Sequence, residues 1–404
     1  MKKSLLATLL TGLFASSANA GIVIPAGDWT LDIGGVVNAY YTNTRGTGDA
    51  VVGGLGGPNA TGERNESNIT TGLLPNYLSV SGKSRQNDLD IGFTISINPG
   101  ASSVAGGDQG SNQENRQAFL TIGDASWGSV KLGKDLGIYA SDAILNDMTL
   151  LGVGSGAGKL AGNTTTLGRI GSGYMYADWK SQIAYTTPNW DGLQATVGVT
   201  QAWNAQTADL VAATTAVDAA SATSTGRGGS QPAFEGKVSY SWTGPVAGKV
   251  WTSAFTQKVE GLSGANADDR AYAWDLGGTV SAGAVGLTGY YYDGKGIGRT
   301  IQLLDGFDTT GKRRDSNGGY VQATYTLPTA TKLGVAYGKS NLDRNSAETK
   351  TALVEQNRMW TVGAYHPLTK SVNLVAEYSD VKSEAQNGAE GQSRTVSAGA
   401  ILFF

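Results

Sequence analysis

The fold is decided by a stretch near the start of the chain, Asp28–Asn43, which reads DWTLDIGGVVNAYYTN. Apolar and polar residues alternate along it with a period of two. One set contains Trp29, Leu31, Ile33, Val37, Ala39 and Tyr41, and the other contains Thr30, Asp32, Asn38 and Thr42. Successive side chains of a β-strand point to opposite faces, so the pattern predicts a strand with one apolar face and one wet face.

The same alternation recurs along the whole chain. In NDLDIGFTISIN (87–98), for example, Leu89, Ile91 and Phe93 alternate with Asp90 and Thr94. Segments of this kind predict sixteen strands. Their approximate ranges are 28–43, 76–84, 87–98, 114–123, 127–134, 179–188, 192–202, 233–243, 248–258, 270–282, 285–294, 317–327, 332–341, 357–366, 371–382 and 393–404.

The connections between these segments alternate in length. Short links, which alternate with long ones rich in Gly, Asn, Ser and Asp, read KSRQ (83–86), PNWD (188–191), TGPVAGK (243–249), SAGA (281–284), PTAT (328–331) and PLTK (367–370). Hairpins with tight turns at one end and long loops at the other are typical of transmembrane β-barrels.

Aromatic residues divide between the two ends of the predicted strands. Beside short turns or the chain start lie Trp29, Trp127, Trp190, Trp242 and Trp251, and Phe404 joins them; near the long loops lie Tyr40, Tyr41, Tyr77, Tyr272, Trp274, Tyr290, Tyr291 and Tyr292. Amphipathic rings concentrate at the two interfaces of a membrane, so the distribution predicts two aromatic belts.

Composition and the first residues limit the class of protein. The opening MKKSLLATLLTGLFASSANA has the layout of a cleaved secretory signal over residues 1–20, so the mature chain is expected to start near Gly21. With no cysteine, the exported chain cannot depend on disulfides, and a net charge of −3 without single-sign blocks argues against nucleic acid. No other long apolar run exists, so a membrane protein of this composition has to be a barrel.

We therefore predict an all-β protein whose mature chain, 21–404, forms one antiparallel transmembrane barrel domain. Sixteen strands that pair first to last leave no open edge, and lipid tolerates none. The terminal stretch TVSAGAILFF (395–404) supplies the closing strand. A ring of this size is too wide for side chains to fill, so it should enclose a water-filled channel.

Taken together, these features resemble the general porins of Gram-negative outer membranes. The resemblance covers essentially the whole mature chain. The stretches that resemble the family locally are NRQAFLTIG (115–123), GSVKLGK (128–134), SQIAYTTPNWDGLQATVGV (181–199) and NLVAEYSD (373–380). The resemblance implies an outer-membrane location, a homotrimer, and passive diffusion of small hydrophilic solutes and ions. It also implies that the barrel-assembly machinery reads the terminal Phe404, although no charged or His residue stands just before the last positions, unlike the usual ending.

The same resemblance implies a constriction formed by the third loop, residues 135–178, folded into the lumen. Asp142 and Asp147 lie in its first half and are candidates to face the passage. Basic residues are expected opposite, and the candidates are Arg116, Lys131 and Lys134, with Arg169 near the return of the loop. Opposed charges across a narrow gap would create a transverse field that selects solutes by sign.

Other functions find weaker support in the residues. The stretch GVGSGAG (152–158) lacks the flanking strand and helix of a phosphate-binding loop, and the single histidine, His366, cannot by itself form a metal site or a complete catalytic triad. We therefore expect neither an enzyme nor a cofactor nor a bound metal, although a loop Ca²⁺ site around Asp268 and Asp269 stays open. The alternatives are a substrate-selective channel for organic acids or sugars, an adhesion or structural barrel, and an outer-membrane enzyme dependent on His366.

Overall fold

The computed structural model describes residues 21–58, 62, 64–101, 113–155, 165–206, 230–262 and 268–404. The expected signal peptide, 1–20, lies outside these residues. Within them the chain forms nineteen β-strands and two short helices. The elements are β1 (Ile22–Ala26), β2 (Trp29–Gly48), β3 (Asn65–Thr70), β4 (Tyr77–Gln86), β5 (Leu89–Pro99), β6 (Gln113–Glu114), β7 (Ala118–Asp124), β8 (Gly128–Leu136), α1 (Ser141–Leu145), the 3₁₀ helix η1 (Met148–Leu151), β9 (Trp179–Thr186), β10 (Leu193–Thr200), β11 (Ala233–Trp242), β12 (Val246–Glu260), β13 (Asp268–Ala282), β14 (Val285–Lys295), β15 (Asp315–Thr326), β16 (Lys332–Asp343), β17 (Val354–Pro367), β18 (Val372–Ala385) and β19 (Glu390–Phe403).

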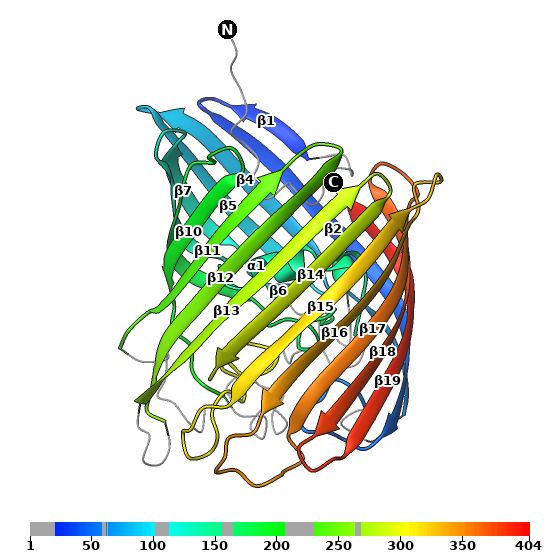
Figure 1. The fold of residues 1–404 in the computed structure, drawn as a ribbon. Coiled ribbons are helices and arrows are strands. Elements are labelled where there is room, and N and C mark those ends of the chain that lie inside the picture. The colour runs from blue at the N-terminus through cyan, green and yellow to red at the C-terminus, as the bar shows by residue number, and fades with distance from the viewer. Residues whose placement is uncertain are drawn as a thin grey trace.

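These strands form one closed antiparallel barrel (Figure 1). Consecutive strands pair along the chain, and the ring closes where β19 pairs with β2, from Gly391↔Gly48 to Phe403↔Val36. Among the described residues, β3 and β4 share one position in the ring and β6 and β7 share another, while β1 extends the sheet beyond the end of β19. The barrel therefore has sixteen strand positions, which confirms the predicted fold class.

The first residues of the mature chain form a strand that the alternation did not predict. β1 is a short hairpin partner of the start of β2, with Ile24 opposite Leu31. It was missed because Ile22, Val23 and Ile24 are all apolar and show no period of two. All three side chains are exposed, at the rim of the barrel.

Tight turns lie at the end of the barrel where β1 and the carboxyl-terminal Phe404 are found, as the link lengths predict. The first of them is displaced from its predicted place, because KSRQ continues β4 and the turn is formed by Asn87 and Asp88. Both residues have positive φ, 48° and 62°. That conformation matches the right-handed twist of a two-residue hairpin, and Asn and Asp adopt it readily.

The inner and outer faces follow the alternation closely. In β2, Asn38 and Thr42 are buried on the inner side, while Val37 and Tyr41 are 56% and 53% exposed on the outer side. Apolar residues are thus exposed on the outside and polar ones are turned inward, the reverse of a soluble protein and the pattern of a barrel in lipid. No helix among the described residues has the length and apolar character needed to cross a bilayer.

The predicted aromatic belts need five corrections. Tyr77 of β4 lies directly opposite Val36 of β2, which is 1% exposed on the inner face, so Tyr77 faces inward. Tyr40, Trp251, Tyr290 and Tyr292 are buried on the inner face, with exposures of 1%, 2%, 6% and 0%. Other belt residues, including Tyr41, Trp190, Tyr272, Trp274 and Tyr291, are exposed as expected. Position near a strand end does not determine the face of a ring; the parity of the residue within the strand does.

Candidate functional site

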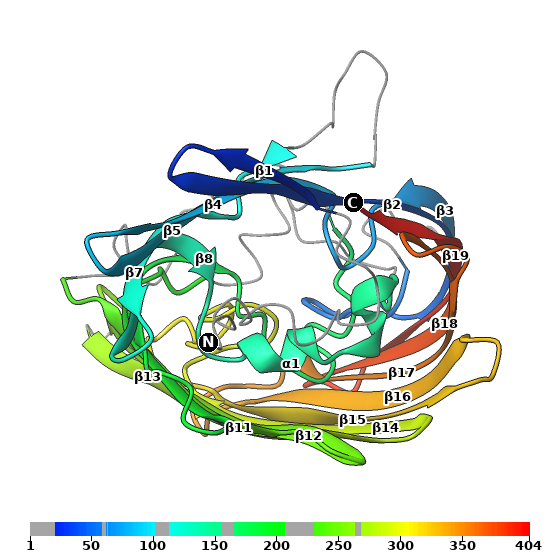
Figure 2. The same cartoon turned by 90° about the horizontal axis from the view of Figure 1, so that it is seen from above.

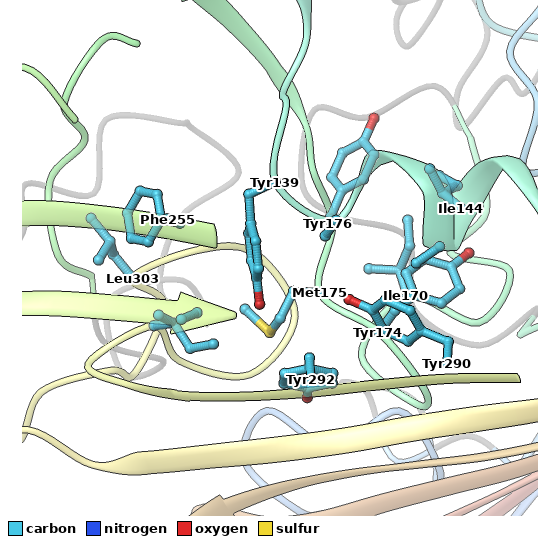
Figure 3. Close-up of a cluster of buried hydrophobic side chains, with 14 of the residues drawn as sticks. Tyr139, Ile144, Ile170, Tyr174, Met175, Tyr176, Phe255, Tyr290, Tyr292 and Leu303 are labelled. Atoms are coloured by element: carbon cyan, nitrogen blue, oxygen red, sulfur yellow. The ribbon is translucent and has the colours of Figure 1, made fainter. Parts of the chain in front are cut away.

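The third loop leaves the wall after β8 and lies inside the ring. Figure 2, a view along the barrel axis, shows α1 within the ring, close to the wall made by β14, β15 and β16. Tyr139 and Tyr174 of the loop are fully buried. Their rings lie 6.1 Å from Phe255 of β12 and 5.8 Å from Tyr320 of β15, respectively, and Figure 3 shows Tyr139 and Tyr174 within this cluster. Apolar packing therefore attaches the loop to one side of the barrel.

Two carboxylates of the wall bind the loop backbone at points far apart. One Oε atom of Glu235, on β11, accepts hydrogen bonds from the Ile138 and Tyr139 amides, both at 2.8 Å. One Oε atom of Glu377, on β18, accepts from the Val153 and Gly154 amides, also both at 2.8 Å. Charge-assisted bonds of this kind are roughly twice as strong as neutral ones, so they restrain the loop firmly.

A buried lysine compensates the first of these carboxylates. The Nζ atom of Lys180, on β9, donates to Glu235 and to the side chain of Gln302, both at 2.6 Å. It also lies 4.5 Å from the centroid of the Trp203 ring. Lys180 is 1% exposed, and its charge is tolerated there because it is both paired and hydrogen-bonded.

Asp142, the acidic residue at the start of α1, is held by two lysines of the wall. Its Oδ2 atom lies 2.8 Å from Nζ of Lys237 on β11, and its Oδ1 atom pairs with Lys249 on β12. Burial alone would raise the pKa of Asp142, but the two ammonium groups outweigh it and hold that pKa below its ordinary value of 3.8. The carboxylate is 3% exposed, whereas the lysine side chains are 21% and 29% exposed.

Asp147 and Arg169 are fully buried and do not line a passage, contrary to the expectation from the sequence. Asp147 is the N-cap of η1 and accepts from the Thr149 amide at 3.0 Å and from the Tyr174 hydroxyl at 2.8 Å. Burial, reinforced by Asp147, raises the pKa of Tyr174 well above 10.0, so the hydroxyl stays a donor. Arg169 donates to the Met359 carbonyl at 3.0 Å and lies 4.0 Å from Asp147.

The three basic candidates, Arg116 in the link between β6 and β7 and Lys131 and Lys134 on β8, have different surroundings. Lys131 shares the inner face with Thr121 and Ala184, its register partners, and pairs with Asp135. Lys134 is opposite Ala118, and Ala118 is opposite Ile95, which is 55% exposed on the outer face. Lys134 therefore belongs to the outer face and cannot contribute to a constriction, because the odd spacing from Lys131 reverses its direction.

The side chain of Arg116 is also buried and does not line the passage. Its Nε atom lies 2.7 Å from Glu114, its guanidinium lies 5.8 Å from the centre of the Trp179 ring, and its side chain is 4% exposed. It is a buried, paired group at the far end of the strands. None of the basic candidates thus contacts Asp142, whose partners are Lys237 and Lys249.

Sequence reasoning missed the residues that hold the loop: Glu235, Glu377, Lys180, Lys237 and Lys249. A signal was present, because each has a parity opposite to its apolar neighbours, such as Phe234 and Val238 beside Glu235 and Lys237. A systematic search for charged residues at inward parity would have found them. It would not have told which of them contact the loop.

Other motifs of the sequence acquire ordinary structural roles where they are described. Asp268 and Asp269 pair with Lys258 and Arg313, at 3.1 Å and 3.0 Å. Among the described residues, no group of three His, Cys, Asp or Glu side chains has the arrangement of a metal site. The Nδ1 atom of His366 lies 2.9 Å from the Thr331 hydroxyl. Residues 156–158 of GVGSGAG lie outside the described part.

A family model described as Gram-negative porin matches residues 6–386. The chain belongs to the Gram-negative porin family. It is therefore an outer-membrane barrel that forms a channel for passive diffusion.

Solved porin structures share the fold at low sequence identity. The outer membrane channel DcaP of Acinetobacter baumannii has a TM-score of 0.64 and 16% identity, over 94% of this porin and 99% of that chain. The anion-selective porin from Comamonas acidovorans has a TM-score of 0.61 and 16% identity, over 93% and 100%. Salmonella typhi OmpF, in complex with daunomycin, has a TM-score of 0.60 and 15% identity, over 95% and 100%. No curated protein matches this porin.

Proposed function

We propose that small hydrophilic solutes cross this porin between the third loop and the inner faces of β4, β5, β7 and β8, and that anions cross more readily than cations. The third loop is the constriction in this proposal. The distribution of burial supports the route: inner residues of β12 such as Ser253 and Phe255 are buried, whereas Ser79, Ser81 and Lys83 of β4 keep solvent exposure.

The observation that carries the charge preference is the pairing of one carboxylate with two lysines. Asp142 is hidden from water, while Lys237 and Lys249 both remain partly exposed, so the solvent meets one surplus positive charge at the loop. Lys83 is also exposed and forms no ion pair with another described residue, but the equally exposed Asp32 on the same inner face offsets it, so the surplus charge is that of the two lysines at the loop. Arg85 forms ion pairs with Asp90 and Asp124, and Lys131 forms one with Asp135, so neither adds to the surplus positive charge.

A surplus of positive charge in a narrow, partly dehydrated gap favours anions. At about 8 Å, one charge changes the energy of a passing monovalent ion by roughly 0.5–2 kcal/mol, depending on the local dielectric. Such differences are enough to select by sign without excluding neutral solutes.

The proposed function also concerns the oligomeric state of the barrel and its insertion into the membrane. One solved structure of similar fold, OmpT of Vibrio cholerae, is described as a trimer form; it has a TM-score of 0.54 and 13% identity, over 93% of this chain and 99% of that chain. We propose that this porin likewise forms a homotrimer, and that Phe404 is read by the barrel-assembly machinery. Membrane lipids surround the barrel, and solutes are its transient partners.

Planar-bilayer recording tests the proposed route and selectivity. In a KCl gradient, the zero-current potential of the wild-type channel should have the sign of anion preference, and the double variant Lys237→Gln, Lys249→Gln should shift it toward cations. The matched control Lys258→Gln, Lys295→Gln removes two charges outside the passage and should leave it unchanged.

Two results would contradict the proposal. A wild-type channel that prefers cations would refute the charge assignment. Saturable block of the current by one organic acid or sugar would favour the substrate-selective channel instead. Closure in groups of three equal steps is expected of a trimer.

A further inference from the structure

A pocket lies under the third loop, on the side of the barrel away from the proposed route. It has a volume of about 220 Å³ and lies between η1 and the inner faces of β13 to β17. The residues that border it include Leu145, Met148 and Leu151 on the loop side and Thr288, Thr324 and Lys332 on the barrel side. We call this space the loop pocket.

Two glycines of the barrel wall give the loop pocket its shape. Gly286 of β14 borders the pocket opposite Thr324, so no side chain fills that position. At Gly334 of β16, a side chain would lie 2.6 Å from the sulfur atom of Met148. Glycine there lets the loop approach the wall, and Met148 then covers the pocket.

The loop pocket lies on the periplasmic side of the third loop. The tight turn in which the Leu327 amide donates to the Thr331 carbonyl, at 2.8 Å, comes directly before Lys332. Ser281 and Gly286, which also border the pocket, flank the tight turn between β13 and β14. Short turns are periplasmic in barrels of this kind, so solutes reach the pocket from the periplasm.

Lys332 supplies a positive charge to the loop pocket. It is directly opposite Tyr365, which is 3% exposed on the inner face, so the lysine side chain also belongs to the inner face. Lys332 is exposed and forms neither an ion pair nor a side-chain hydrogen bond with another described residue. Its ammonium group therefore meets the solvent of the pocket without a carboxylate partner.

The neighbouring charged groups do not neutralise this lysine. Among the described residues that border the pocket, only Asp147 is acidic, and its fully buried carboxylate accepts hydrogen bonds from within the loop. Glu377 accepts from the Tyr365 hydroxyl at 2.6 Å and from two loop amides. Lys249, on the neighbouring strand β12, pairs with Asp142. The charge that remains for a solute is that of the unpaired ammonium group.

The other surfaces of the loop pocket differ in polarity. On the barrel side, the hydroxyl oxygens of Thr279 and Thr288 lie 3.1 Å apart, and Thr324 adds a third hydroxyl group. On the loop side, Leu145 and Met148 are apolar. At roughly 30 Å³ per molecule, the volume holds about seven waters, so a solute that fills it is small.

We infer that the loop pocket binds a small hydroxy carboxylate from the periplasmic side. The Lys332 ammonium group pairs with the carboxylate, the threonine hydroxyls bond the hydroxyl group of the solute, and its short carbon chain lies against Met148. One ammonium group beside an apolar surface suits a carboxylate better than a phosphate, which uses several donors. The pocket lies outside the proposed route, so a bound solute leaves the current open, and the inference does not rest on the anion preference.

Methionine methyl groups report binding in the pocket directly. Besides Met1, the chain has three methionines, Met148, Met175 and Met359, and of these only Met148 borders the pocket. In the purified barrel in detergent, labelled with carbon-13 at these methyl groups, 2-hydroxybutyrate should shift the Met148 resonance along a saturable curve with a millimolar Kd. The Met175 and Met359 resonances should not move. The variant Met148→Leu identifies the Met148 signal.

Variants of the lysine test which group holds the solute. Lys332→Gln should bind 2-hydroxybutyrate roughly ten- to a hundredfold more weakly, whereas Lys332→Arg keeps the charge and should retain most of the affinity. The matched control Lys83→Gln removes another exposed lysine of the inner face at the same end of the barrel and should bind as the wild type does. Unchanged Met175 and Met359 resonances show that each variant is folded.

Two titrations of the wild-type barrel need no variant. The neutral 2-hydroxybutyramide has nearly the same shape without the charge and should bind at least about tenfold more weakly; equal binding would overturn the inference. Inorganic phosphate that displaces the carboxylate at equal concentration would indicate a site for any small anion and would also overturn it.

General attraction of anions to the lumen gives a different result. A Met148 shift that never saturates, or an equal loss of binding in Lys332→Gln and Lys83→Gln, would mean that no specific site exists. A channel that prefers cations but keeps the Met148 titration would refute the proposed charge preference alone.

Discussion

At the scale of single residues, the charge of Asp142 depends on its two lysine partners. Without Lys237 and Lys249, a carboxyl group so deeply buried would lose its proton reluctantly, and the segment around α1 would lack its polar attachment. With them, the carboxylate is stable and the lysines are partly neutralised. The pair of lysines therefore both fixes the loop and determines the sign of the local field.

This arrangement predicts a pH dependence with a defined direction. The pKa of Asp142 is lowered in the folded protein, so its contribution to stability is complete above the unfolded value of about 3.9 and disappears as the pH falls through the lower folded pKa. Acidification through that folded pKa, which lies below 3.8, should then free both lysines and increase the anion preference, measured as the zero-current potential from pH 7 down to the lowest pH at which the barrel stays folded.

The variant Asp142→Asn provides the control for that titration. It lacks the carboxylate at every pH, so its anion-to-cation permeability ratio at pH 7 should already exceed that of the wild type by at least about twofold. The two curves should meet at the acid end. Parallel curves over the whole range would mean that other carboxylates, such as Asp90 and Asp32, account for the effect.

At the scale of elements, the third loop is positioned by hydrogen bonds from side chains on distant strands. Glu377 is 224 residues from Val153, and the Tyr365 hydroxyl donates to the other oxygen of the same carboxylate at 2.6 Å. Gly152 is closely approached by this carboxylate, so a side chain at that position would displace it. The loop is thus held at two separated points, by Glu235 and by Glu377.

Replacing Glu377 by alanine should release the second attachment point without unfolding the barrel. A hydrogen bond to a charged group contributes about 1.5–3 kcal/mol, so hydrogen exchange at the Val153 and Gly154 amides should accelerate by roughly ten- to a hundredfold. Exchange at the Ile138 and Tyr139 amides, bound by Glu235, serves as the internal control. Equal acceleration at both sites would show that the loop opens as one unit.

The closing strand depends on its last residue. The Gly35 amide donates to the Phe404 carbonyl at 2.8 Å, and the Phe404 amide donates to the Gly35 carbonyl at 3.1 Å. The terminal residue therefore continues the pairing between β19 and β2 beyond the last strand residue. An ordered terminus of this kind is unusual, because chain ends are generally frayed.

Deleting Phe404 removes two backbone hydrogen bonds and should lower the yield of folded barrel in the outer membrane, measured as the heat-modifiable band on a gel. If Phe404 is an assembly signal, the loss of yield should be larger than the loss of these two bonds alone would cause. Phe404→Tyr keeps the aromatic ring and should assemble as the wild type does. Refolding of the purified deletion variant into detergent separates the two effects. A deletion that assembles normally in cells would remove the proposed role of Phe404 as an assembly signal.

At the scale of the whole molecule, the barrel reverses the usual distribution of polarity. Val321 and Leu276 are 61% and 55% exposed on the outside, whereas Lys180, Glu235 and Glu377 are buried inside. Such an arrangement is stable because lipid replaces water around the outer face and the closed ring satisfies the strand backbone.

An arginine on the outer face should therefore be costly only in a bilayer. Val321→Arg should reduce the free energy of unfolding by about 2–4 kcal/mol in lipid vesicles, measured by denaturant titration. The control Ser79→Arg places the same side chain on the inner, water-accessible face and should cost less than about 1 kcal/mol. Equal costs at the two positions would argue that lipid does not surround Val321.

The sequence predicted much of the barrel because alternation is a local property. Residues such as Leu31, Ile33 and Val37 alternate with polar neighbours, and a period of two determines both the strand and its two faces. The errors arose where that parity was not applied, as for Trp251, Tyr290 and Lys134, or where a segment lacks alternation, as in β1. Lys131 and Asp142 remain predictions as constriction residues, whereas the structure withdraws Arg116, Lys134, Asp147 and Arg169 from the passage.

The sequence by itself determined the strands, their faces, the closure of the ring and the family. Only the tertiary structure decided what the third loop contacts, because Asp142 and Lys249 are 107 residues apart and no local pattern relates them. Alternation arises from the geometry of one strand, whereas a contact across the barrel depends on the position of every strand between the two residues.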